Sequence, residues 1–298
     1  MQKIKCAICI INYKKTKSTE LAKQTVSFLQ ARGVEFLCPQ HDDVAKLGYS
    51  AHELNLLEED LRCYLAEIPQ KKPDIAFIFG GDGTLIHASR VLALYHIPII
   101  GVNLGKLGFL TAVEPNNLES SLVKLMEGNY LLEDRMLLWG EVRRNDKVVM
   151  SSIAQNDVII NHGSISRIID INVLIDHQLA LSFSGDGLVL ATPTGSTAYS
   201  LSAGGPIVLP NAQMIVVTPI SPHNLYARPM IANADSEIQV ICNFLNKKAQ
   251  VTFDGQNLFL LQHGDEVIIK KSPYSACFVW IESSMFFTNL HRKLCSGI

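Results

Sequence analysis

The stretch Phe79–Thr84, with the sequence Phe-Gly-Gly-Asp-Gly-Thr, constrains the fold of this chain more than any other feature. It follows an apolar run, Ile75–Phe79, that predicts a buried strand, and it precedes a pattern of helical spacing that begins at Leu85. Glycines allow a backbone to approach a bulky ligand, and the amide groups of such a loop at a helix N-terminus attract phosphate. A single carboxylate, Asp82, would repel phosphate there, so we interpret it as a base or a metal partner. The alternative is a Gly-Asp-Gly turn that closes a hairpin.

The first part of the chain alternates apolar runs with amphipathic segments. This alternation predicts an α/β domain over residues 1–134, with a mostly parallel sheet covered by helices. Ligands of such sheets bind beyond the carboxyl ends of the strands, where Gly80–Thr84 and Asn103–Phe109 both fall. The predicted strands are Ile4–Ile11, Val34–Cys38, Asp74–Phe79 and Ile97–Val102, and the predicted helices are Ser18–Arg32, Glu53–Ile68, one beginning near Leu85, and Leu118–Met126.

After about residue 135 short strands separated by turn residues dominate, which predicts an all-β, sandwich-like domain over residues 135–282. The stretch Met285–Leu294 predicts a helix within a C-terminal tail, residues 283–298, which we expect to pack back on the first domain. The predicted strands are Leu137–Arg143, Lys147–Ser152, Asp157–Asn161, Ile168–Ile175, Leu179–Ser184, Met214–Thr218, Glu237–Phe244, Gln250–Phe253, Asn257–Leu261, Glu266–Lys270 and Cys277–Glu282.

The composition excludes several classes of protein. The net charge of −2 offers no basic field for nucleic acid or an anionic membrane, and no apolar run is long enough to span a bilayer. The seven cysteines are scattered and the nine histidines show no metal-ligand spacing, so we expect a reduced, cytoplasmic, soluble protein. The motifs of P-loop enzymes, of G-x-G-x-x-G dehydrogenases, of G-x-S-x-G hydrolases and of protein kinases are absent.

Two further stretches indicate a polar ligand. Gly185–Pro206 is crowded with Gly, Ser, Thr and Ala and holds one aromatic residue, Tyr199. Small hydroxyl residues provide donors and acceptors with little bulk, and a tyrosine can stack on a nucleotide, whereas the alternative is a surface loop. Asn156 and Asp157 precede an apolar run and together can bind a diol such as the ribose hydroxyls, although Asn-Asp also makes turns.

Taken together, these motifs resemble the NAD kinase family over most of the chain and in the family's order. The overall length and the tail Phe287–Leu294 are similar to the bacterial branch. One such match would be weak evidence, but the whole set in order is highly specific. The matching segments are Gly80–Leu85, Gly101–Leu110, Asn156-Asp157, Asp186-Gly187, Thr192–Gly205, Pro219–Pro229 and Asp254–Gln256.

The resemblance implies an NAD kinase/diacylglycerol kinase-like fold and a defined reaction. The γ-phosphoryl group of ATP is transferred to the 2′-hydroxyl of the adenosine ribose of NAD, giving NADP, and Asp82 is the base that faces this hydroxyl. The implied phosphate loop consists of Gly80, Gly81, Gly83 and Thr84. The residues implied in NAD binding are Asp82, Gly83, Phe109, Asn156, Asp157, Arg167, Ser184, Asp186, Thr197, Ala198, Tyr199, Ser200, Leu201, Ser202 and Gln256.

Two residues depart from the family pattern. Asp157 stands where many members carry Glu, so its reach is one methylene shorter, and Ser184 stands where many bacterial members carry a basic residue. The resemblance further implies Mg²⁺ carried by ATP without a dedicated metal site. It implies NAD and ATP as partners, no nucleic acid or membrane, and a homodimer or homotetramer.

Other functions remain open alternatives on the sequence. A lipid kinase that shares the Gly-Gly-Asp-Gly-Thr loop would need an apolar acceptor pocket or a basic membrane-facing patch, and neither is evident. A dinucleotide sensor that has kept the fold would not need Asp82 as a base. Polyphosphate as donor, NADH as acceptor and feedback inhibition by NADPH are also left undecided.

Overall fold

The computed structural model describes residues 4–12, 16–37, 61–62, 65–66, 72–104, 108–163, 168–243, 249–282 and 286–295. The chain divides into two compact units. Unit 1 consists of Met1–Asp134 together with Ala276–Ile298, and unit 2 consists of Arg135–Ser275. The chain leaves unit 1 within strand β5 (Leu131–Arg144) and returns to it within strand β16 (Glu266–Trp280). Residues after Ser275, which we expected to remain in the β-rich domain as far as 282, therefore group with the first unit.

The sheet of unit 1 is parallel, as its alternating sequence predicts. Its strands lie in the order β2-β1-β3-β4, and the end of β16 adds alongside β4 through a parallel pairing of Phe278 with Ile99. Strands β3 and β4 are buried along their whole length, which is typical of strands covered on both faces. The four strands are β1 (Cys6–Ile11), β2 (Glu35–Leu37), β3 (Ile75–Gly80) and β4 (Ile99–Asn103).

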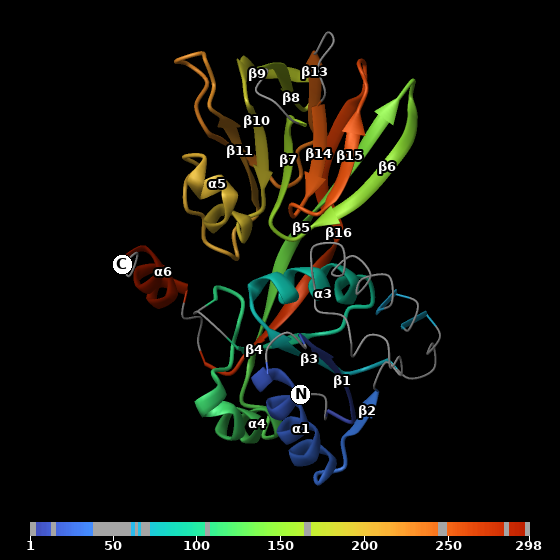
Figure 1. Ribbon diagram of the computed structural model, residues 1–298, viewed down its shortest axis with the longest axis vertical. Helices are drawn as coiled ribbons and strands as arrows, with labels where there is room; N and C mark the ends of the chain where they lie inside the picture. The colour runs from blue at the N-terminus through green and yellow to red at the C-terminus, as the bar shows by residue number, and fades with distance from the viewer. Residues whose placement is uncertain are drawn as a thin grey trace. The chain divides into compact units, whose positions relative to one another are not determined.

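Helices cover both faces of this sheet (Figure 1). Helices α1 (Thr16–Gln30) and α4 (Leu118–Met126) share one hydrophobic cluster with the strands. Helix α3 (Asp82–Leu94) packs on the other face, where Leu85 lies so close to Gly101 that a Cβ there would be 2.7 Å from it. Of the predicted helix 53–68, only residues 61–62 and 65–66 are described, and they are helical with Leu61 and Leu65 buried; the rest lies outside the described residues.

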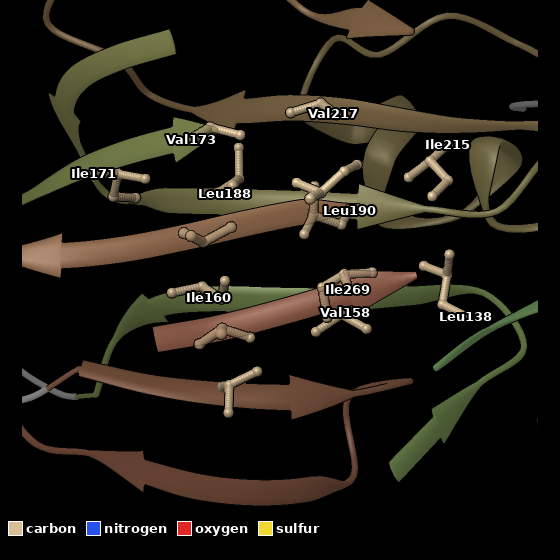
Figure 2. Packing of buried hydrophobic residues seen from close by; sticks show 14 of the residues in the cluster. Leu138, Val158, Ile160, Ile171, Val173, Leu188, Leu190, Ile215, Val217 and Ile269 are labelled. Carbon is tan, nitrogen blue, oxygen red and sulfur yellow. The ribbon is translucent and has the colours of Figure 1, made fainter. Parts of the chain in front are cut away.

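Unit 2 is a β-sandwich, which confirms the predicted fold class. One sheet has the antiparallel order β12-β11-β10-β7-β14-β15, and strands of the other pair in the order β16-β13-β8-β9, with β5 pairing β6. Alternate side chains from both sheets form one hydrophobic core, shown in Figure 2. The strands are β6 (Lys147–Ala154), β7 (Asp157–His162), β8 (Ile169–Ile175), β9 (Gln178–Gly185), β10 (Gly187–Ala191), β11 (Met214–Ile220), β12 (Met230–Asn233), β13 (Ile238–Asn243), β14 (Ala249–Phe253) and β15 (Asn257–Leu261).

The sequence prediction was wrong at one long strand and incomplete elsewhere. We predicted two strands at 266–270 and 277–282, but β16 runs without a break from Glu266 to Trp280. Pro273, between the two predicted strands, is exposed within β16, while Ser272 beside it is buried. The remaining elements among the described residues are the 3₁₀ turns Pro115–Asn117 and Gly195–Thr197, helix α5 (Tyr199–Ser202), which was not predicted, and helix α6 (Phe286–Cys295). In the described part of the chain, no helix combines the length and apolar character needed to cross a membrane.

Candidate active site

Asp82 is the first residue of helix α3, directly after strand β3 and the single linking residue Gly81. The motif is thus a strand–loop–helix, and the hairpin alternative is excluded. The Asp82 carboxylate accepts two backbone hydrogen bonds, from Phe109 N to Oδ2 at 2.9 Å and from Leu110 N to Oδ1 at 3.2 Å. Its side chain remains 28% exposed. The carboxylate is therefore fixed in direction and still accessible to a ligand.

Gly108 makes this arrangement possible. A Cβ atom on residue 108 would lie 2.1 Å from Oδ1 of Asp82, well inside the contact distance of two atoms. Only glycine therefore allows the segment to approach closely enough for its next two amides to bind the carboxylate. Sequence reasoning did not single out Gly108, although it belongs to the Gly101–Leu110 motif.

The predicted phosphate loop divides into an accessible part and a packed part. Gly83 is exposed and an added Cβ there would meet nothing within 4 Å, and Gly81 is half-buried. Thr84 is buried beneath the loop, and its Oγ1 accepts a hydrogen bond from the Asn12 amide at 3.1 Å. A Cβ at Gly80 would lie 2.6 Å from the Thr84 side chain. Gly81 and Gly83 can meet a ligand, whereas Gly80 and Thr84 hold the loop in shape.

Phe109 lies against the C-terminal helix within unit 1. Its ring centroid is 6.2 Å from that of Phe286, and the Lys293 ammonium lies 4.0 Å above its face. Asn289, buried on the same helix, donates a hydrogen bond from Nδ2 to the Gly108 carbonyl at 3.3 Å. Lys293 also lies 3.4 Å from Oδ2 of Asp82. Helix α6 thus adds a cation next to the carboxylate, which sequence reasoning missed.

In unit 2, Asn156 and Asp157 are held by a residue whose role the sequence did not reveal. The Asp254 carboxylate accepts hydrogen bonds from the backbone amides of Gln155, Asn156 and Asp157 at 2.8, 2.7 and 3.1 Å. Asp254 and Gly255 form the tight turn between β14 and β15, both with positive φ. An Asp-Gly pair between two strands is a strong hairpin signal, which could have placed this carboxylate at a turn.

Asp157 is buried and carries a strongly shifted pKa. Burial, together with the negative charge of Asp254, raises its pKa from the ordinary value of 3.8 to about 7. Both protonation states of Asp157 are therefore populated near neutral pH. A carboxyl group in this state can accept a hydrogen bond or donate one, which suits it to a ligand that offers hydroxyl or ring nitrogen atoms.

The Ser/Thr/Gly-rich run lies directly against Asn156. Thr192 N donates to the Asn156 carbonyl at 2.8 Å, and a Cβ on Gly195 would lie 2.0 Å from the same oxygen. The run then forms a 3₁₀ turn and helix α5, from which Tyr199 protrudes with 42% exposure. Ser200 differs from its neighbours, because it is buried and its hydroxyl pairs with that of Thr218 at 3.0 Å. Among the predicted NAD-binding residues of the run, those that reach the surface wholly or in part are Thr197, Ala198, Tyr199, Leu201 and Ser202.

Of the other predicted NAD-binding residues of unit 2, Ser184 and Asp186 lie apart from this group. Asp186 precedes β10 while Thr192 follows it, so five strand residues of about 3.3 Å each separate them. Asp186 lies 3.7 Å from His162 Nε2, and the Ser184 hydroxyl donates to Asp170 on the neighbouring strand. Gln256 lies in the Asp254 turn, and Arg167 falls outside the described residues. The structure of unit 2 therefore shows two separate groups of predicted residues rather than one.

In the comparison with known proteins, both halves of the chain match the same family. The family model described as the ATP-NAD kinase N-terminal domain matches residues 8–130, and the ATP-NAD kinase C-terminal domain matches residues 155–281. The NAD kinase of Yersinia pestis is 40% identical over 267 residues, which cover 90% of this chain and 88% of that protein. The NAD kinase of Caldanaerobacter subterraneus subsp. tengcongensis is 37% identical over 287 residues, which cover 96% and 97%.

Solved structures extend the similarity to the fold. A crystal structure of an NAD kinase from Archaeoglobus fulgidus in complex with ATP superposes with a TM-score of 0.69 at 25% identity, covering 98% of this chain and 99% of that one. The crystal structure of yeast NADH kinase complexed with NADH gives a TM-score of 0.80 at 22% identity, covering 100% and 89%. At this level of identity the second similarity is evidence for the fold alone.

Proposed function

The chain belongs to the NAD kinase family and phosphorylates NAD with ATP, and we propose that Asp82 is the carboxylate that receives the proton of the acceptor hydroxyl. The acceptor is the 2′-hydroxyl of the adenosine ribose. Its oxygen forms a bond to the γ-phosphorus as the bond to the β,γ-bridging oxygen breaks, and NADP and ADP leave. One observation carries the proposal: Asp82 is fixed by two backbone amides and its side chain is still exposed.

The position of Asp82 suits a base that acts late in the reaction. Phosphoryl transfer passes through a loose transition state, with most of the charge on the equatorial phosphoryl oxygens, so little proton abstraction is needed early. The carboxylate first orients the hydroxyl by accepting its hydrogen bond, and it takes the proton as the new bond forms. The N-terminus of α3, with Gly81 and Gly83 open beside it, offers a favourable field for the donor phosphates.

For NAD binding we propose the group around Asn156 and Asp157. Their positions are fixed by Asp254, and the small residues of the run beyond Thr192 lie against them. Asp157, with its pKa near 7, can exchange hydrogen bonds with adenine or ribose, and Tyr199 is exposed enough to stack on a base. Phe109, beside Asp82 in unit 1, is the residue we assign to the adenine of the acceptor.

The donor brings its own cation in this proposal. Within the described ranges, no three His, Cys, Asp or Glu side chains gather as a metal-binding cluster. We expect Mg²⁺ to reach the enzyme on ATP, where it neutralises phosphate charge. A relative from Archaeoglobus fulgidus was crystallised with ATP, which supports ATP rather than polyphosphate as the donor.

We also propose a homodimer or homotetramer that works in the cytoplasm. Leu225 and Tyr226, in the segment after β11, are 81% and 89% exposed, and large apolar side chains at such exposure favour a subunit contact. Cys242 and Cys277 are free thiols, which agrees with a reducing compartment. Light scattering on the purified protein measures the oligomeric state directly, and a monomer at micromolar concentration would contradict the first part.

The direct test of the catalytic proposal is NADP formation from NAD, ATP and Mg²⁺, followed with an NADP-specific dehydrogenase. We expect Asp82→Asn to lower kcat by about 10²–10⁴-fold, the usual span for a general base. Asn keeps the side-chain shape, and its single amide oxygen can accept one of the two backbone hydrogen bonds, so the fold should persist. Far-ultraviolet circular dichroism and NAD binding serve as controls. A loss of less than tenfold in a folded variant would rule out the assigned role.

A further inference from the structure

Helix α6 presents one face to the segment that holds Asp82. Phe286, Asn289 and Lys293 follow one another at spacings of three and four residues, so they lie on the same side of the helix. Phe286 contacts the Phe109 ring, Asn289 binds the Gly108 carbonyl, and Lys293 reaches both Phe109 and Asp82. The C-terminal helix is therefore docked specifically on the candidate catalytic segment.

Lys293 lies beside the Asp82 carboxylate and leaves room there for a further hydrogen-bond donor. A carboxylate has about four lone-pair positions for hydrogen-bond donors. Phe109 N and Leu110 N occupy one on each oxygen, and the Lys293 ammonium approaches Oδ2 at 3.4 Å. Counting contacts among the described residues alone, one position on Oδ1 is left for a hydroxyl donor. Lys293 and Asp82 are each about one-third exposed, so both can meet bound substrates.

The reaction proposed for Asp82 creates an electrostatic conflict. A hydroxyl that donates to the carboxylate lies roughly 2.7 Å from it, and the phosphorus must come to about 3–3.5 Å from the hydroxyl oxygen. The negatively charged phosphoryl group thus arrives about 5–6 Å from a negatively charged carboxylate. Lys293 Nζ lies 3.4 Å from Oδ2 of that carboxylate, so its positive charge offsets the negative charge that the arriving group would meet.

We propose that Lys293 is a catalytic cation, whose ammonium offsets the charge of Asp82 and contacts the transferring phosphoryl group. The inference rests on the proposed role of Asp82. Lys293 neither gives nor takes a proton: the hydroxyl proton passes to Asp82, and the ammonium stabilises charge on the phosphoryl oxygens throughout. The cation–π contact of the ammonium with the Phe109 ring holds the cation in position before ATP binds.

The first experiment compares three variants of helix α6. Lys293→Met removes the charge and keeps the apolar stem, Lys293→Arg keeps the charge, and Arg292→Gln is the control on the adjacent position. We expect Lys293→Met to lower kcat by about 10²–10³-fold, as for loss of one charge-stabilising donor, with NAD affinity within about threefold. Lys293→Arg should restore at least a tenth of the activity, and Arg292→Gln should stay within about twofold of the original protein.

A double-mutant cycle separates an electrostatic role from a structural one. If Lys293 offsets the Asp82 charge, Lys293→Met should cost much less in an Asp82→Asn background than in the original protein. A structural role would give the same factor in both backgrounds. Thermal unfolding of every variant identifies any loss of fold, and if Lys293→Met is unfolded, Lys293→Gln replaces it in the same cycle.

The outcomes distinguish this inference from the proposed function. Nearly full activity in Asp82→Asn would overturn the role of Asp82. Loss of activity in Asp82→Asn with full activity in Lys293→Met would overturn the inference alone. A higher kcat or a lower KM for NAD in Lys293→Met would also overturn it, because the lysine would then be blocking the site. Equal factors in the two backgrounds would assign Lys293 to the packing of α6.

Discussion

Asp157 carries an ionisation that differs between the folded and the unfolded chain. Its folded-state pKa is about 7, above the ordinary value of 3.8, so between roughly pH 4 and 7 the folded protein binds the additional proton. Stability contributed by this group therefore falls as the pH rises through that range. The new side chain of the variant Asp157→Asn does not ionise, so the variant lacks this loss of stability. The melting temperature of the variant minus that of the original protein should therefore increase by a few degrees from pH 5 to pH 8. Circular dichroism melting at four pH values measures the difference.

The control for this prediction is Asp235→Asn, which changes an exposed aspartate of the same unit. Its melting temperature should follow that of the original protein at every pH. Parallel curves for Asp157→Asn as well would show that the carboxyl group is not protonated in the folded state near pH 7.

A local sequence motif was enough to single out some residues of the candidate site. Residues whose role depends on a contact with a distant part of the chain were missed. Asp82 stands in a recognisable stretch directly after an apolar run, and Asn156 and Asp157 stand directly before one. Asp254 binds amides 97–99 positions away, and Lys293 lies 211 positions from Asp82. No local pattern encodes such separations, so the partners that fix the predicted carboxylates and amides became visible only in the fold.

At the scale of elements, the site depends on how closely the segment after β4 approaches the start of α3. Gly108→Ala would place a Cβ 2.1 Å from Oδ1 of Asp82, so the carboxylate or the segment must move. Because both amide hydrogen bonds depend on that approach, we expect kcat to fall by about 10²-fold or more, as for a misplaced catalytic group. The measurement is the NADP-formation assay with the melting temperature of the variant.

A second glycine gives a matched control for loss of stability alone. Gly33, after α1, has φ of +80 and open space around it, so Gly33→Ala strains the backbone without touching Asp82. We expect it to cost about 1 kcal/mol of stability while activity persists. If Gly108→Ala lost no more activity than Gly33→Ala, the close approach would not be needed for catalysis.

The sequence predicts helices and strands correctly where the secondary-structure propensity and the burial pattern agree. The prediction fails where pairing between strands overrides the propensity. Helices α1, α4 and α6 and the strands of the parallel sheet follow from apolar spacing and glycine at the ends, such as Gly33 and Gly128, both with positive φ. Strand β16 forms despite the low strand propensity of its proline and lysines, because each of its two halves pairs with a neighbouring strand. Reading the strand as two pieces concealed the return of the chain into unit 1.

At the scale of the whole molecule, that return predicts where the chain can be shortened. Phe278, Val279 and Trp280 at the end of β16 are buried in unit 1, although they follow unit 2 in the sequence. Removing them exposes their partners and forfeits about 5–9 kcal/mol of burial, at about 1.5–3 kcal/mol for each side chain. The whole free energy of unfolding of a domain is about 5–15 kcal/mol. A chain that ends at Ser275 should therefore not fold its first unit.

A chain that ends at Glu282 keeps those three side chains and loses the segment that contains α6. Asn289 is the one deeply buried side chain among residues 286–294, whose burial is described. We expect this chain to remain folded and to melt within several degrees of the original protein, because little apolar surface is lost. Its NADP formation should fall at least as far as that of Lys293→Met, since both the cation and the Asn289 contact are gone. The measurements are the soluble yield and the melting curve of each truncated chain. If the two chains were equally stable, the folding of unit 1 would not depend on the end of β16.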